Sequence, residues 1–96
     1  MRPSVSYKEG LLEDLKDPKE AAAYLDAALE EGDSDTFLLA LRDVAEVKGG
    51  MAKLAEQSNL NRESLYRMLS EKGNPQLSSL FSVLKSLGLK LTVNAA

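Results

Sequence analysis

The sequence predicts a mainly α-helical domain of about five or six helices, followed by a short C-terminal β-strand. Apolar residues recur at spacings of three and four over most of the 96 residues, which is the period of an amphipathic helix. Glycine, proline and asparagine interrupt that period often enough to divide the chain into short helices. From Leu89 onward the period changes to two, which is typical of a half-buried strand.

Three helices are predicted in the first half of the chain. The first is short and begins at a capping box formed by Ser6 and Glu9. The second begins with Asp17 as the N-cap and Pro18 in the first turn, and the third begins near Asp33. Their apolar stripes are expected to face the core: Tyr7, Leu11 and Leu15 in the first, Ala21, Ala22, Leu25, Ala28 and Leu29 in the second, and Phe37, Leu38, Leu41, Val44 and Ala45 in the third.

The second half is predicted to hold two short helices joined by a polar turn, then a last helix and the strand. The helix pair spans residues 51–70, with the sequence MAKLAEQSNLNRESLYRMLS. The residues expected to face the core are Leu54, Ala55, Leu65, Met68 and Leu69 in this pair, and Leu77, Leu80, Phe81, Leu84 and Leu87 in the last helix. In the strand, Leu89, Leu91 and Val93 alternate with Lys90, Thr92 and Asn94.

The strand needs a partner, because a single strand leaves its backbone donors and acceptors unpaired. Within the chain, the first residues around Val5 are the available partner. The favoured alternative is the same strand of a second copy, which would give a two-fold homodimer.

The helix pair carries the strongest functional signal. Ala55 is small enough to let two helices approach closely, and Asn59 suits a left-handed turn. Asn61 can cap the second helix through its side-chain oxygen. The outer face of that helix carries Asn61, Arg62, Glu63, Tyr66 and Arg67.

A helix with an apolar inner face and such a polar outer face is suited to lie in a DNA groove. The alternative is an ordinary solvated face. In that case Glu63 and Arg67, spaced i and i+4, would form a surface ion pair.

Composition narrows the class of protein. The length suits a single domain over residues 1–96. Cysteine and histidine are both absent, which removes disulfides, thiolate metal sites and the commonest general base. The remaining residues show no catalytic constellation, so neither an enzyme nor a cofactor is expected. The sequence shows no membrane-spanning run or signal peptide, and a cytoplasmic protein is predicted.

The net charge of −3 is divided unevenly along the chain. Residues 1–47 hold five Lys or Arg against twelve Asp or Glu, a net charge of −7, whereas residues 48–96 hold seven against three, a net charge of +4. This asymmetry predicts an acidic helical part and a basic part that contains the helix pair, with one cationic and one anionic partner. For the acidic part alone, solvated helix faces without a partner remain the simpler interpretation.

The run LRDVAEVKGGMAKLAEQSNLNRESLYRMLSEKGNPQLSSLFSVLKSLGLKL, residues 41–91, resembles a Cro/lambda-repressor-type helix-turn-helix domain. The shared features are the LR opening, the LA pair, the polar turn, the NP stop and the last helix ending in LG. With the upstream LLEDLKDP and LDAALEEGD, the whole chain resembles the addiction-module antidote family, the HigA-like antitoxins of type II toxin–antitoxin operons. The fold class implied is a lambda-repressor-like helical domain.

The resemblance implies a homodimer that binds operator DNA, represses its own operon, and captures a small basic RelE-like ribonuclease toxin. By matching position, Asn61, Arg62, Glu63, Tyr66 and Arg67 would face the major groove or its phosphates, and Lys53 would lie near phosphate with the first-turn amides of its helix. The chain departs from many such repressors at Met51, where they carry a glutamine that contacts phosphate.

The toxin would meet acidic side chains of the first half, namely Glu13, Asp14, Asp17, Asp26, Glu30, Glu31 and Asp33. Two other functions stay open. One is a phage-repressor-type regulator without a toxin partner, and the other is a helical protein-interaction module in which the motif is coincidental.

Overall fold

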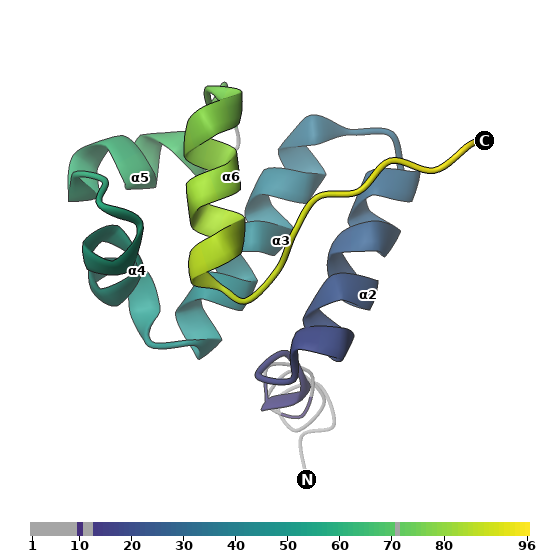
Figure 1. Cartoon of the computed structure of the whole chain (residues 1–96), viewed down its shortest axis with the longest axis horizontal. Helices are drawn as coiled ribbons and strands as arrows, with labels where there is room; N and C mark the ends of the chain where they lie inside the picture. The colour runs from purple at the N-terminus through teal and green to yellow at the C-terminus, as the bar shows by residue number, and fades with distance from the viewer. Residues whose placement is uncertain (1–9, 11–12, 71) are drawn as a thin grey trace, which may run out of the picture.

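The computed structural model describes residue 10, residues 13–70 and residues 72–96 (Figure 1). Within these ranges the chain forms the helices α2 (Pro18–Glu30), α3 (Ser34–Val47), α4 (Gly50–Ser58), α5 (Arg62–Met68) and α6 (Leu77–Ser86). The mainly helical prediction is confirmed. The helix predicted to begin at Ser6 lies largely outside the described residues, as does Val5, although Leu15 is buried as expected.

The helices α2 and α3 lie side by side and run in opposite directions, whereas α4 contacts α3, α5 and α6 (Figure 1). Each of the first two begins at the predicted acid. Asp17 accepts a hydrogen bond from the Lys19 amide at 2.9 Å, and Asp33 accepts one from the Asp35 amide at 2.9 Å. These carboxylates satisfy amides that would otherwise lack partners in the first turn.

One continuous core joins all five described helices. α3 contributes most to it and is buried over the whole predicted stripe. The core side chains are Leu15, Ala21, Leu25, Ala28, Phe37, Leu38, Ala40, Leu41, Val44, Ala45, Met51, Leu54, Ala55, Leu65, Met68, Leu69, Val83, Leu84 and Leu87. In α2 the predicted stripe is too wide, since Ala22 and Leu29 are exposed.

The buried face of α6 differs from the predicted one. Leu84 and Leu87 are buried as expected, but Leu77 is 60 % exposed and Phe81 is 48 % exposed. Val83, which was not predicted to face inward, is fully buried. The helix therefore turns its 83–84–87 side toward the core, and two large apolar side chains one turn apart remain on the surface.

The predicted C-terminal strand is wrong for the described chain, in which no residue forms a strand. The backbone amide of Leu89 donates to the Leu84 carbonyl at 2.8 Å and closes the end of α6. Beyond it, Leu89 and Leu91 lie over α2 and Phe37, and Val93 is almost fully exposed. The alternating pattern thus reflects side-chain contacts with a helical surface rather than a backbone ladder.

Candidate nucleic-acid interface

The turn between α4 and α5 has the predicted backbone. Asn59 adopts φ 59° and ψ 36°, the left-handed conformation, and among the described residues it is the non-glycine residue with a positive φ. The amide of Leu60 donates to the Ala55 carbonyl at 3.0 Å, which fixes the direction in which the chain leaves α4. Asparagine tolerates this conformation better than other residues with a side chain.

Asn61 caps α5 as predicted, and the cap has a chemical consequence. Its side-chain Oδ1 accepts a hydrogen bond from the Ser64 amide at 2.9 Å. The amide nitrogen of the side chain is left for a ligand, while the oxygen is occupied. Paired contact with adenine uses both atoms of an asparagine amide, so the cap and that contact compete.

The inner face of α5 is fixed by three buried side chains. Leu65 and Leu69 are completely buried and Met68 is 7 % exposed. On α4, Ala55 and Leu54 are buried in the same core. A seven-residue helix is too short to be stable alone in water, so these contacts hold α5 and set which side chains point outward.

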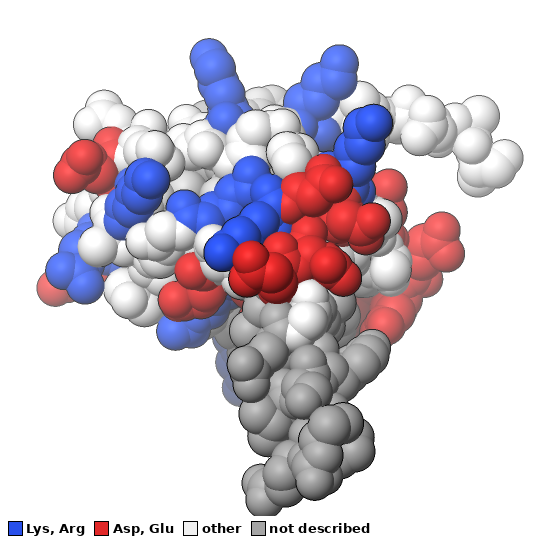
Figure 2. Space-filling view, turned by 90° about the horizontal axis from the view of Figure 1, so that it is seen from below, with Lys and Arg blue, Asp and Glu red and all other residues white. Residues whose placement is uncertain are grey.

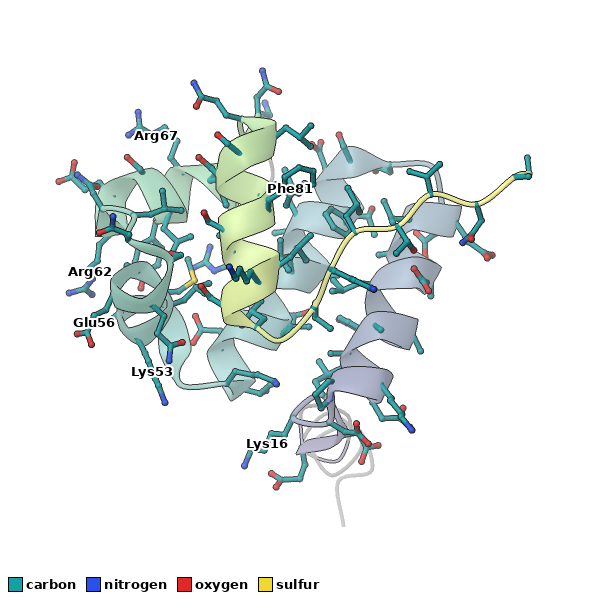
Figure 3. The ribbon with its side chains drawn as sticks, viewed as in Figure 1. Lys16, Lys53, Glu56, Arg62, Arg67 and Phe81 are labelled. Atoms are coloured by element: carbon teal, nitrogen blue, oxygen red, sulfur yellow. The ribbon has the colours of Figure 1, made fainter. Side chains whose placement is uncertain are left out.

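The outward side chains of α5 include Arg62, Glu63 and Arg67, all exposed. Figure 3 shows Arg62 extending outward on the side that also carries Lys53 and Glu56 of α4, and Arg67 extending outward at the top of α5. Glu63 and Arg67 form no ion pair, so the alternative of a surface salt bridge is not realised in this structure. Both guanidinium groups are presented to solvent.

Tyr66 is tied to a residue that sequence reasoning missed. The guanidinium carbon of Arg42, on α3, lies 5.3 Å from the centre of the Tyr66 ring, within the range of a cation–π interaction. Tyr66 is 38 % exposed. The two residues are 24 positions apart, so helix periodicity gave no signal for this contact. The Arg42 guanidinium therefore adds a positive charge beside α5, although Arg42 belongs to residues 1–47, the half with negative net charge.

At the start of α4, Lys53 and Met51 have different environments. The stem of Lys53 lies over Gly49, where an added Cβ would be 2.5 Å from its Cδ atom, and its ammonium is exposed. Gly49 has φ 120°, and α4 begins without a side-chain cap. Met51 is 2 % exposed and belongs to the core, so its side chain is not available to a phosphate.

A hollow beside α5 brings in another basic residue that was not predicted. Arg67 and Lys72 line it together with the polar side chains of Ser64, Asn74 and Gln76. Lys72 follows the end of α5 in the turn that leads to α6. A basic residue just after a helix predicted to bind DNA is the sequence signal that would have identified it.

The acidic residues predicted to meet a toxin are spread over several surroundings. Glu13 pairs with Lys16 at 3.2 Å, Asp17 and Asp33 are helix caps, and Asp26 lines a hollow beside the C-terminal residues. Asp14, Glu30 and Glu31 are exposed. Figure 2 shows most acidic side chains of one face in its middle and right part, toward α2, while basic side chains lie on the left, in the middle beside the acidic ones and along the upper edge.

The sequence matches a family model described as "Probable addiction module antidote protein" over residues 8–95. The chain belongs to this antidote family. It is also 35 % identical over 81 residues to an uncharacterised protein of Haemophilus influenzae, with 84 % of this chain and 82 % of that protein covered. No solved structure matches the chain.

Membership of the antidote family supports an antitoxin role and implies a toxin as partner. It also favours a regulatory protein over an enzyme. Among the described residues, no three His, Cys, Asp or Glu side chains gather in a way that could hold a metal ion. None of the helices in the part of the chain that the structure describes has the length and hydropathy needed to cross a membrane.

Proposed function

We propose that this antidote-family protein is a cytoplasmic DNA-binding antitoxin. It binds its own operator as a homodimer, represses its operon, and neutralises a RelE-like ribonuclease toxin. The observation that carries the DNA arm is the outer face of α5, where Arg62 and Arg67 are exposed and unpaired with Glu63 above a fully buried inner face. In the proposal, α4 and α5 act as a lambda-repressor-like helix-turn-helix.

Each side chain of this face has a contact that its chemistry suits. The guanidinium groups of Arg62 and Arg67 can each pair with the O6 and N7 atoms of a guanine. The hydroxyl of Tyr66 can donate to a phosphate, with Arg42 held over its ring. Glu63 can accept from the amino group of a cytosine. Asn61 donates from its amide nitrogen, because its oxygen caps α5.

Phosphate contacts would come from both sides of α5. At the start of α4, the first-turn amides and Lys53 present positive charge and unpaired donors. On the other side, Lys72 lines the same hollow as Arg67. These contacts position α5 without reading sequence. Because Met51 is buried, the phosphate contact that many such repressors make with glutamine is replaced by Lys53 and Lys72.

The size of α5 supports a dimer. Seven residues span about 10 Å, so one copy reaches a single major groove. Two copies would present α5 to successive grooves about 34 Å apart on a near-palindromic site. Leu77 and Phe81, both exposed on α6, favour that helix as the contact between copies.

The test is the double variant Arg62→Ala plus Arg67→Ala, titrated against DNA from upstream of its own gene. Each arginine–guanine pair contributes about 1–3 kcal/mol, so binding is expected to weaken by about 100-fold or more. The matched control is Lys85→Ala plus Lys90→Ala, which removes the same charge from exposed positions outside the α4–α5 face. Operator affinity that falls equally in both double variants would show non-specific charge attraction and refute the assignment of α5.

A further inference from the structure

The structure contains an open groove between α2 and α3 that the proposed DNA contacts do not use. Tyr24, Ala27 and Glu31 line it from α2, and Leu39, Ala40 and Asp43 line it from α3. Its lining includes no residue of α4 or α5. A ligand in the groove therefore leaves the Arg62 and Arg67 side chains uncovered.

The floor of the groove is formed by small apolar side chains. Ala28 and Ala40 are each 6 % exposed and belong to the core. At the edge, Leu39 is 42 % exposed although it lies in the middle of a helix whose neighbouring apolar residues are buried. The groove thus offers apolar surface that the described chain leaves uncovered.

The polar atoms at the rim are acidic. Asp43 Oδ2 accepts a hydrogen bond from the Tyr24 hydroxyl at 2.6 Å, and no hydrogen bond within the described chain reaches Oδ1. Burial, and then the neighbouring Asp43, raise the pKa of Tyr24 to about 12, so the phenol stays protonated and orients this carboxylate. Glu31 is exposed at the other side, and the described residues that line the groove include no lysine or arginine.

The other side of the α2–α3 pair is already covered. There, Leu89 packs against the core, and Leu89 and Leu91 border a hollow with Ala22, Leu25 and Phe37. The same two helices therefore have one face occupied by the C-terminal residues of their own chain and one face open. The open face differs because the described residues that line it belong to α2 and α3 alone and include no lysine, whereas Lys90 lies beside Asp26 in the lining of the other side.

We infer that the α2–α3 groove is where this antidote binds its toxin, through an apolar segment of the toxin that carries an arginine or lysine. The inference rests on the proposed function. Charge complementarity selects this occupant, because residues 1–47 carry a net charge of −7 and no lysine or arginine of the described chain lines the rim. A cationic side chain would pair with Asp43 and Glu31, while its apolar neighbours would cover Leu39.

Two other occupants fit less well. DNA is repelled by the carboxylates at the rim. A second copy of this chain carries the same net charge of −3 and the same acidic half, so it complements the acidic rim less well than a basic protein does. The toxin remains the partner that can fill the groove while DNA is bound, so toxin and operator would be held at the same time.

The experiment measures toxin binding by calorimetry with the full chain and the basic protein encoded beside its gene. The variants Leu39→Asp and Glu31→Lys are each expected to weaken binding by about tenfold or more, as for central interface residues. Both positions are exposed, so the helical circular dichroism should be unchanged. Glu46→Lys is the matched control, because it makes the same charge change on α3 at an exposed residue that does not line the groove and is not among the acids expected to meet the toxin.

Each outcome tests toxin binding in the groove independently of the proposed DNA binding by α4 and α5. Selective loss in Leu39→Asp and Glu31→Lys, with operator affinity unchanged, supports it. Equal loss in Glu46→Lys indicates general attraction by the acidic half and overturns it. A changed oligomeric state in Leu39→Asp with toxin binding intact assigns the groove to a second copy and also overturns it. If the wild-type protein binds no such toxin, the proposed antitoxin function itself fails.

Discussion

The α4–α5 pair and the α2–α3 pair use their charged residues differently. In α5, the exposed arginines make no contact that holds the fold, and stability comes from Leu65, Met68 and Leu69 on the opposite face. In α2 and α3, several of the acids predicted to meet a partner are also structural, since Asp17 and Asp33 cap the two helices.

In the α4–α5 pair, mutations can therefore change binding without changing stability. In the α2–α3 pair, several acidic residues affect both. In α5, substitutions on the outer face should change binding alone. In α2 and α3, removing a capping acid should change both stability and charge. The groove residues Glu31 and Leu39 are an exception within the second pair, because neither caps a helix N-terminus nor belongs to the core.

The largest effect on stability is expected from Leu65→Ala. Leu65 is completely buried, and deleting such a side chain costs about 2–5 kcal/mol through lost transfer energy and the cavity left behind. On the same helix, Arg62→Ala and Arg67→Ala should each change the free energy of unfolding by less than about 0.5 kcal/mol. Urea unfolding of the three variants checks this; an arginine variant as unstable as Leu65→Ala would show that the outer face holds the fold.

A smaller effect is expected at the turn. Asn59→Ala places an alanine at φ 59° and should destabilise the protein by about 1–2 kcal/mol, whereas Asn59→Gly should be close to neutral. Thermal unfolding distinguishes the two. If both variants melt like the wild type, the turn does not depend on its left-handed residue.

In the acidic pair, Asp33→Ala should cost about 1 kcal/mol through loss of the α3 cap. The control is Asp14→Ala, which removes the same charge from an exposed residue that caps none of the described helices. Chemical denaturation compares them. Equal stability of the two variants would contradict the claim that capping acids in the α2–α3 pair contribute to stability.

The smallest effect is expected from Tyr24→Phe, which removes the hydrogen bond to Asp43 and should cost about 0.5–1.5 kcal/mol near neutral pH. The folded-state pKa of Tyr24 is raised to about 12 from 10.0, so the folded protein holds this proton more tightly than the unfolded chain. The tyrosine's contribution is therefore complete below pH 10 and is lost as pH rises toward 12.

Unfolding measured across that range should show a steeper decline for the wild type than for Tyr24→Phe. Parallel declines would indicate that Tyr24 titrates as it does in the unfolded chain. If Tyr24→Phe binds toxin normally, that result would in addition show that Asp43 needs no orientation by the Tyr24 hydroxyl.

Local rules predicted much of this molecule. The caps at Asp17, Asp33 and Asn61 and the left-handed Asn59 depend on neighbouring residues only, and the structure has all four. All five residues predicted for the stripe of α3 are buried, and the prediction missed only Ala40 among the buried residues of that helix.

The errors occurred where the outcome depends on distant parts of the chain. The apolar face of α6 is wide, and only its contacts decide that Val83 is buried and Phe81 exposed. The alternation after Leu89 predicts a strand, but in the described chain the side chains lie on α2 instead. The contact of Arg42 with Tyr66 and the α2–α3 groove both join separate helices, so no local pattern reports them.

The most direct test of the central claim is an equilibrium titration of the wild-type protein with two DNA duplexes at two salt concentrations. One duplex comes from upstream of its gene, and the other is a shuffled duplex of equal length. The account predicts binding to the first that is tighter by about a thousandfold or more, with an affinity that falls as salt rises. Equal affinity for both duplexes, or no binding to either at low salt, would contradict the claim that the α4–α5 face reads DNA.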